Sequence, residues 1–142
     1  MSEVAPASRT TTILVYSDDL NTRGEVRLAL GRRIAADLPE IEIVECATHQ
    51  AVSKALDHGG IDLVIMDGEA VPAGGIGLAR QVKDEIANCP PIVLLVARVA
   101  DAWLATWSGA EAVVPYPVDA VRLPSSVADV LRSRVTGGAN AR

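Results

Sequence analysis

The chain has 142 residues, of which 49% are hydrophobic and 22% charged, which is typical of one globular domain. The formal net charge of −5 argues against a surface that follows nucleic-acid phosphates. No apolar run reaches transmembrane length, and the first residues lack the pattern of a signal peptide. The sequence therefore predicts a cytoplasmic protein with no nucleic-acid partner and no membrane insertion. Cys46 and Cys89 do not match metal-ligand spacing, so we expect two free thiols in the core.

Five apolar runs predict strands. They cover residues 12–17, 41–44, 63–66, 92–96 and 112–114. Each run is short and is bounded by turn-forming or helical segments, as expected for buried parallel strands.

Helical patterns separate these runs. The stripe of Val26, Leu30, Ile34 and Leu38 predicts a first helix that ends at Pro39. The other predicted helices are one from Thr48 to about residue 58, one around 78–86, a short one over about 101–108, and a last one up to 135.

Strand and helix thus alternate five times, which predicts an α/β sandwich, doubly wound around a five-stranded parallel sheet. We expect one domain over residues 12–135, with flexible tails at 1–11 and 136–142.

Acidic residues follow two of the predicted strands. Asp18 and Asp19 come after the first, and Asp67 comes after the third. Ligands of parallel sheets collect outside the carboxyl ends of the strands, so we expect the three carboxylates to converge there. Such like charges need a cation or a shared proton. The alternative is that they are solvated loop residues or helix caps, a role that suits Asp19 and Asn21.

Several segments match one family in order and spacing. They are Tyr16-Ser-Asp-Asp19, Asp62-Leu-Val-Ile-Met-Asp67, the loop with Pro72, Gly75 and Ile76, Pro91-Ile-Val-Leu-Leu-Val-Ala-Arg98, and Gly109-Ala-Glu-Ala-Val-Val-Pro-Tyr-Pro117. Over about residues 12–135 the chain resembles the receiver domain of bacterial response regulators. The resemblance implies a flavodoxin-like (βα)5 fold and a cis peptide bond between Tyr116 and Pro117.

The resemblance also implies a chemistry. Asp67 would accept a phosphoryl group from a phosphohistidine of a histidine kinase. Asp18, Asp19 and Asp67, with the backbone carbonyl of Glu69, would hold Mg²⁺. The chain would not be an enzyme beyond catalysing its own aspartyl phosphorylation.

Two positions depart from the family pattern. Val96, or at best Ala97, stands where the family has Ser or Thr, and Tyr116 stands where it has Lys. A lost charge-assisted hydrogen bond costs about 1.5–3 kcal/mol, so phosphorylation is expected to be slow, short-lived or uncoupled from shape. Arg98 is a candidate compensating cation.

Trp103 and Trp107 are four residues apart, so they share one face of the short helix before the fifth strand. Together with Tyr116 they predict a protein-binding surface over that helix, the fifth strand and the last helix. The alternative is that the tryptophans fold back and are half-buried. His49 and His58 have no partner at ligand spacing and are expected on the surface.

Three functions fit these observations. The first is a stand-alone, atypical response regulator that acts in a phosphorelay through protein partners. The second is a phosphorylation-independent scaffold with the same fold. The third is a flavodoxin-like protein that binds a small ligand, although the acidic segment 17–24 would repel a phosphate. The sequence specifies neither kinase, output partner nor oligomeric state.

Overall fold

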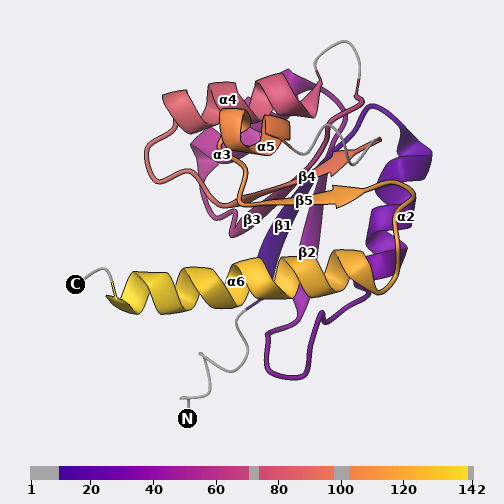
Figure 1. Cartoon of the computed structure of the whole chain (residues 1–142), viewed down its shortest axis with the longest axis vertical. Coiled ribbons are helices and arrows are strands. Elements are labelled where there is room, and N and C mark those ends of the chain that lie inside the picture. Colours follow the sequence, from indigo (N-terminus) through magenta and orange to yellow (C-terminus); the bar gives the residue numbers. More distant parts are fainter. Residues whose placement is uncertain (1–9, 71–73, 98–102, 141–142) are drawn as a thin grey trace.

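The computed structural model describes residues 10–70, 74–97 and 103–140. Its centre is a five-stranded parallel sheet in the order β2-β1-β3-β4-β5 (Figure 1). The strands are β1 (Thr11–Tyr16), β2 (Ile41–Cys46), β3 (Leu63–Asp67), β4 (Ile92–Val96) and β5 (Ala112–Pro115). The predicted parallel sheet is confirmed, and β1 and β3, the strands that Asp18 and Asp67 follow or end, are neighbours in it.

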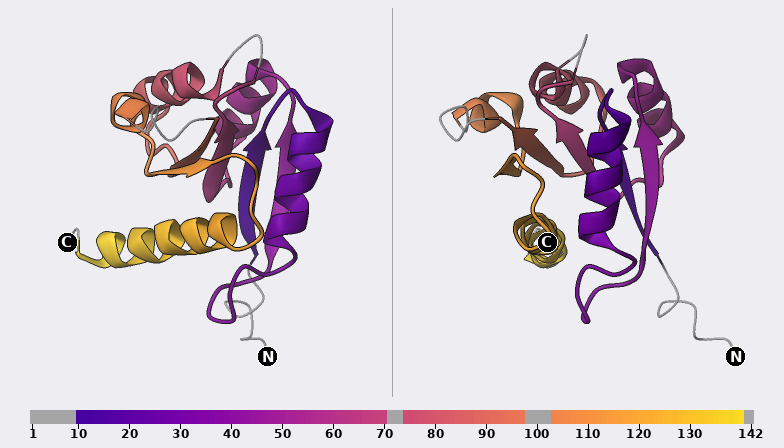
Figure 2. Two further views of the ribbon diagram at one scale, coloured as in Figure 1. Left: turned by 45° about the vertical axis from the view of Figure 1, so that its right-hand side comes forward. Right: turned by 90° about the vertical axis from the view of Figure 1, so that its right-hand side faces the viewer.

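Helices cover both faces of this sheet (Figures 1 and 2). They are α2 (Leu20–Leu30), α3 (His49–His58), α4 (Gly75–Glu85), α5 (Trp103–Ser108) and α6 (Arg122–Asn140). Successive strand residues point to opposite faces. In β1, Leu14 and Tyr16 therefore join the core under α3 and α4, while Ile13 and Val15 join the core under α2 and α6.

The first helix is shorter than predicted. It ends at Leu30, because Gly31 adopts a left-handed φ of 65° and donates its N–H to the carbonyl of Arg27. Ile34 and Leu38 lie beyond the helix, yet both still pack against the core. The four-residue spacing of Ile34 and Leu38 came from their burial in the core and not from a continuing helix. Gly31 was the residue in the sequence that marked the end of the helix.

The last helix is longer than predicted. It begins at Arg122, two residues before Pro124, and continues to Asn140 through residues assigned to the flexible tail. The side chain of Asp119 caps its start by accepting from the N–H groups of Val121 and Arg122 at 2.6 and 3.0 Å. The glycines at 137 and 138, which were assigned to the flexible tail, lie inside the helix.

Two smaller expectations, the cis peptide bond and the free thiols, are confirmed. The Tyr116–Pro117 peptide bond is cis. Cys46 and Cys89 are free thiols, the first buried and the second partly buried, and burial raises the pKa of both. Among the helices that the structure describes, none is long and apolar enough to cross a lipid bilayer.

Candidate functional site

Asp67 is the last residue of β3, at the edge of the sheet where the carboxyl ends of the strands meet. It is only 4% exposed. Its Oδ2 accepts a hydrogen bond of 2.7 Å from the hydroxyl of Ser17, and its Oδ1 accepts one of 2.9 Å from the N–H of Glu69. Both carboxylate oxygens are therefore held by the protein, and the carboxylate has a fixed orientation.

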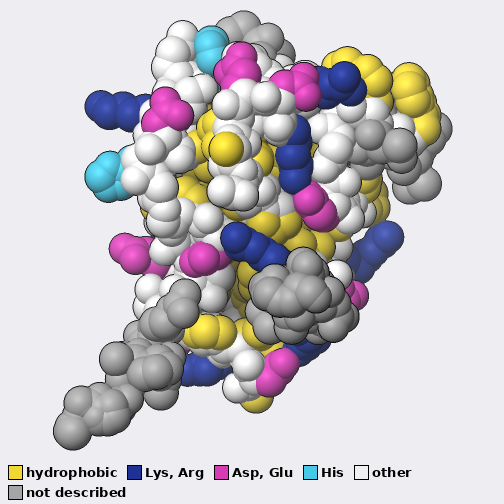
Figure 3. Space-filling model, turned by 90° about the vertical axis from the view of Figure 1, so that its left-hand side faces the viewer, with side chains coloured by type: hydrophobic (Ala, Val, Ile, Leu, Met, Phe, Trp, Pro, Cys, Tyr) yellow, Lys and Arg dark blue, Asp and Glu magenta, His cyan; other side chains and the backbone are white. Residues whose placement is uncertain are grey.

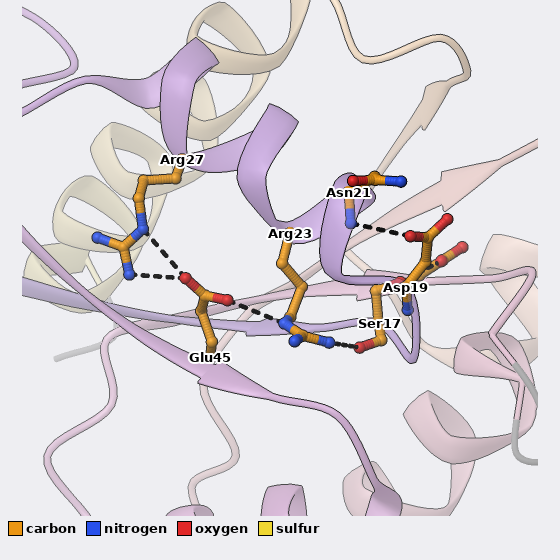
Figure 4. A network of polar contacts seen from close by, with 7 residues as sticks. Ser17, Asp19, Asn21, Arg23, Arg27 and Glu45 are labelled. Carbon is orange, nitrogen blue, oxygen red and sulfur yellow. Dashed lines mark hydrogen bonds and ion pairs between the residues drawn. The ribbon is translucent and has the colours of Figure 1, made fainter.

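Ser17 follows β1 directly and is fully buried. Its hydroxyl oxygen also accepts from the N–H of Asp19 at 3.0 Å. Its carbonyl accepts from the guanidinium of Arg23 at 2.6 Å, and Arg23 is itself paired with Glu45 at 2.9 Å (Figure 4). Arg27 holds the other side of the same carboxylate. A chain of polar contacts thus supports the residue that touches Asp67.

The sequence predicted that Asp18, Asp19 and Asp67 converge on one metal site. Within the described ranges there is no group of three or more His, Cys, Asp or Glu side chains that could hold a metal ion. Asp19 is exposed and caps α2, with its Oδ1 accepting the N–H of Asn21 at 2.8 Å (Figure 4). Asp19 therefore has the role of helix cap that was considered as the alternative.

Asp18 remains beside the pocket. It is exposed in the turn between Ser17 and α2. Burial raises the pKa of the Tyr16 phenol, and the negative charges of Asp18 and Asp67 raise it further. Both carboxylates therefore act on the same phenol.

Glu69 contributes more than its backbone. Its Oε2 accepts the N–H of Ala97 at 3.3 Å, just beyond the end of β4. The side chain therefore bridges the ends of β3 and β4. Val96, one residue earlier, is buried and offers no hydroxyl there.

Tyr116 lies on the other side of Asp67. Its N–H donates to the carbonyl of Val96 at 2.9 Å. Burial raises the pKa of its phenol far above the ordinary value, and a hydrogen bond to Asp67 and the charges of Asp67 and Glu69 raise it further. A hydrogen bond with Thr22 lowers it. At neutral pH the pocket thus receives a neutral hydroxyl where an ammonium was expected from the family pattern.

Two glycines allow backbone segments to approach each other closely beside the pocket. A Cβ on Gly75, the first residue of α4, would lie 2.5 Å from the carbonyl oxygen of Asp67. A Cβ on Gly68 would lie 2.7 Å from the carbonyl oxygen of Leu95. Only residues without a side chain allow β3, β4 and α4 to meet this closely.

Trp103 is 67% exposed, whereas Trp107 is 49% exposed and therefore half-buried, as the alternative had it for that residue. Arg80 of α4 places its guanidinium 5.3 Å from the centre of the Trp107 ring and donates to the Trp107 carbonyl at 2.8 Å. Figure 3 shows exposed hydrophobic side chains at one corner of the molecule, beside basic and acidic side chains.

Arg98 and Pro72 lie outside the described residues.

The sequence prediction missed three contributors: Ser17, Thr22 and Arg23. Ser17 was read as the last residue of a strand, although its place immediately before two acids at a strand end marked it as near the site. Thr22 and Arg23 lie in the first turns of α2 and gave no signal of their own.

Relatives were found by sequence. The proteins Rv3143 and MT3230 of Mycobacterium tuberculosis, both described as uncharacterized response regulatory proteins, are each 54% identical to the chain over 121 residues. The matched region is 85% of this chain and 91% of each relative. No family model matches the chain.

Solved structures show the same fold. The response regulator TrrA of Thermotoga maritima, crystallised in complex with Mg(2+)-BeF, is 25% identical with a TM-score of 0.70 and covers 86% of this chain and 100% of its own. The receiver domain of Francisella response regulator 1452 is 15% identical with a TM-score of 0.74 and covers 88% of this chain and 99% of its own. With the sequence relatives, these likenesses show that the chain belongs to the response regulators and has the receiver-domain fold of two-component signalling.

Proposed function

We propose that Asp67 is the phosphoryl acceptor of this response regulator and that the chain signals through a protein partner. The observation that supports this most directly is the carboxylate itself, nearly buried at the carboxyl edge of the sheet and held by Ser17 and Glu69. Catalysis of phosphoryl transfer consists mainly of positioning and charge stabilisation. A carboxylate with fixed orientation supplies the first of these.

The donor would be a phosphohistidine of a histidine kinase. One oxygen of Asp67 attacks phosphorus, the P–N bond breaks, and the histidine nitrogen leaves with the electron pair. The product is an acyl phosphate on Asp67. On this proposal the chain catalyses only its own modification.

Mg²⁺ fits the oxygens that remain at the site. The carboxylates of Asp18 and Asp67 and the carbonyl of Glu69 are hard oxygen donors, and Mg²⁺ commonly uses one or two carboxylates while it keeps several waters. The absence of a larger acidic group among the described residues is compatible with such a hydrated ion, but not with an all-protein cage. When bound, the ion would neutralise charge on the phosphoryl oxygens.

The pocket has few groups that could stabilise the negative charge of a phosphoryl group on Asp67. Tyr116 offers a neutral hydroxyl, and Val96 offers no donor side chain. We therefore expect a slower or shorter-lived phosphorylation than an ammonium and a hydroxyl at these positions would give.

The test is intact-mass spectrometry after incubation with acetyl phosphate and Mg²⁺. The wild type should gain the mass of one phosphoryl group, and Asp67→Asn should not. Asp18→Asn should require more Mg²⁺ for the same yield. Asp19→Asn is the matched control, because Asn caps a helix as well as Asp, so it should behave like the wild type.

The second candidate function is a scaffold that binds its partner without phosphorylation. It is favoured by the same two positions, since Val96 and Tyr116 lack the groups expected from the family pattern. If the wild type takes up no phosphoryl group and Asp67→Asn captures the same partner with equal affinity, the scaffold replaces the phosphoryl acceptor as the proposed function.

The partner would bind at the exposed tryptophans. Trp103 and Trp107 of α5 are exposed, with Trp107 beside Arg80 of α4, and large exposed aromatic side chains are typical of interface hot spots. The interaction makes no use of nucleic acid or membrane, and we propose that it takes place in the cytoplasm.

A further inference from the structure

We propose that Ser17 is a positioning residue that orients the Asp67 carboxylate and leaves Oδ1 as the attacking oxygen. The proposal rests on the proposed function of Asp67 as phosphoryl acceptor. It concerns which oxygen reacts and what holds the other one in place.

The hydroxyl of Ser17 has one proton, and its hydrogen-bond partners fix the direction in which that proton points. The proton is donated to Asp67 Oδ2 over 2.7 Å, a short hydrogen bond to a charged acceptor. The N–H of Asp19 donates to the same hydroxyl oxygen at 3.0 Å. Because this N–H occupies an acceptor site on the Ser17 oxygen, the hydroxyl is fixed in rotation and its proton points at Asp67.

The backbone of Ser17 is held just as firmly. Its N–H donates to the carbonyl of Cys46 at 3.1 Å, and its carbonyl accepts from Arg23 at 2.6 Å. Glu45 pairs with Arg23 and Arg27 and keeps the guanidinium of Arg23 in place (Figure 4). Ser17 is therefore a rigid donor, whose position is set by β2 and α2 and not by Asp67.

These contacts make the two oxygens of Asp67 unequal. Oδ2 faces a fully buried side chain, whereas the N–H on Oδ1 belongs to Glu69, which is exposed. On this proposal the phosphoryl donor, which arrives from solvent, reacts at Oδ1, on the side of the exposed Glu69. After the transfer Oδ1 bridges to phosphorus, and Oδ2 becomes the carbonyl oxygen, which still accepts the proton of Ser17.

A hydroxyl also suits the chemistry better than a charged group in this position. A carboxylate 2.7 Å from Oδ2 would repel Asp67 unless a cation or a proton lay between them. The neutral Ser17 holds the carboxylate without placing a second negative charge beside it.

The test compares Ser17→Ala, which removes the donor, with Ser17→Thr, which keeps it, and with Ser17→Cys, which keeps the volume but donates weakly. Ser108→Ala is the matched control, because Ser108 is also fully buried but accepts from Ala110 N–H in another part of the fold. The thermal midpoint of each variant shows whether it is folded.

Two measurements are made on each folded variant. The first is the NMR signal of the Glu69 amide in the unmodified protein, which reports the hydrogen bond to Oδ1. The second is the affinity for beryllofluoride with Mg²⁺. In Ser17→Ala we expect the Glu69 amide to shift and exchange faster, and beryllofluoride affinity to fall about tenfold, the effect of one hydrogen bond to a charged group. Ser17→Thr should restore both, or Ser17→Cys should lie between if Thr does not fit.

The proposal is overturned if the Glu69 amide and the affinity are unchanged in Ser17→Ala, or if Ser108→Ala changes them equally. A wild type that binds no beryllofluoride and takes up no phosphoryl group overturns the proposed function instead. In that case the Glu69 amide alone decides whether Ser17 orients Asp67.

Discussion

The pocket around Asp67 and the surface at α5 use their side chains in opposite ways. In the pocket, Ser17 and Asp67 are buried and hydrogen-bonded to each other, and among the described residues no buried side-chain polar atom lacks a partner. At α5, Trp103 and Trp107 expose large apolar rings. The buried polar groups of the pocket are thus satisfied within the chain, whereas the α5 surface gains its binding energy only when another molecule covers it.

The largest effect is expected at the α5 surface. Changing both tryptophans, Trp103→Ser and Trp107→Ser, should abolish partner capture, because aromatic hot spots each contribute about 2 kcal/mol or more to binding. Fold stability should fall by less than about 1 kcal/mol, mainly through the contact between Arg80 and Trp107. Pull-down and denaturant unfolding measure the two quantities.

Leu28→Ser is the control for that experiment. Leu28 is 85% exposed on α2, on the other side of the molecule from α5 in Figure 1. Its replacement removes exposed apolar surface without touching the tryptophans. If Leu28→Ser and the double variant lose the partner to the same extent, the binding surface does not lie on α5.

A second change adds a positive charge to the pocket around Asp67. Tyr116→Lys should strengthen beryllofluoride binding about 10- to 100-fold, because a charge-assisted hydrogen bond is worth about 1.5–3 kcal/mol. Tyr116→Phe is the matched variant without any polar group and should bind no better than the wild type. Equal affinities for Lys and Phe at this position would show that charge balance does not limit the pocket.

A third change tests the contact between the pocket and α4. Gly75→Ala places a Cβ 2.5 Å from the carbonyl of Asp67 and should destabilise the fold by about 1–3 kcal/mol through overpacking. Gly77→Ala in the same helix meets no atom within 4 Å and should stabilise by about 0.5–1 kcal/mol. Denaturant unfolding compares them, and a stable Gly75→Ala would mean that the contact is looser than described.

The smallest effect is expected behind the pocket, at Glu45. Hydrogen bonds from Arg23 and then Arg27 hold the pKa of Glu45 below its ordinary value. This contribution to stability is therefore present above the unfolded-state pKa and is lost as the pH falls through the folded-state pKa. Glu45→Gln should cost less than about 1 kcal/mol at neutral pH, and its difference from the wild type should vanish in acid.

Urea unfolding of both proteins between neutral and acidic pH measures this difference. Glu42→Gln, an exposed acid on the same strand, is the control. A difference between Glu45→Gln and the wild type that stays constant down to low pH would exclude the ion pairs as its cause.

The sequence predicted the position of Asp67 because a buried parallel strand has a strong pattern and its end fixes where the next side chain lies. It did not predict the partners of Asp67. Ser17 contacts Asp67 although no role was predicted for it, because a serine at a strand end carries no charge to reveal it. Asp19 is the helix cap, a role that competed with metal binding for the same acid. Such choices depend on the direction of individual side chains, which periodicity does not encode.

The stop of α2 at Gly31 was missed for a related reason. Burial of Ile34 and Leu38 continued the apolar spacing after the helix had ended, so the hydrophobic pattern and the backbone signal disagreed. Where they disagree, a glycine with a left-handed φ decides the local structure.

The bare backbone of Gly75 has a mechanical consequence. No side chain separates the start of α4 from the backbone of residue 67. Because close-packed backbone has little room to adjust, a displacement at the end of β3 would move α4 as well. About one and a half turns further along α4, Arg80 donates a hydrogen bond to the carbonyl of Trp107 in the last turn of α5. Helix α4 therefore contacts the aspartate at one point and the tryptophan helix at another, and a movement of α4 would reach both.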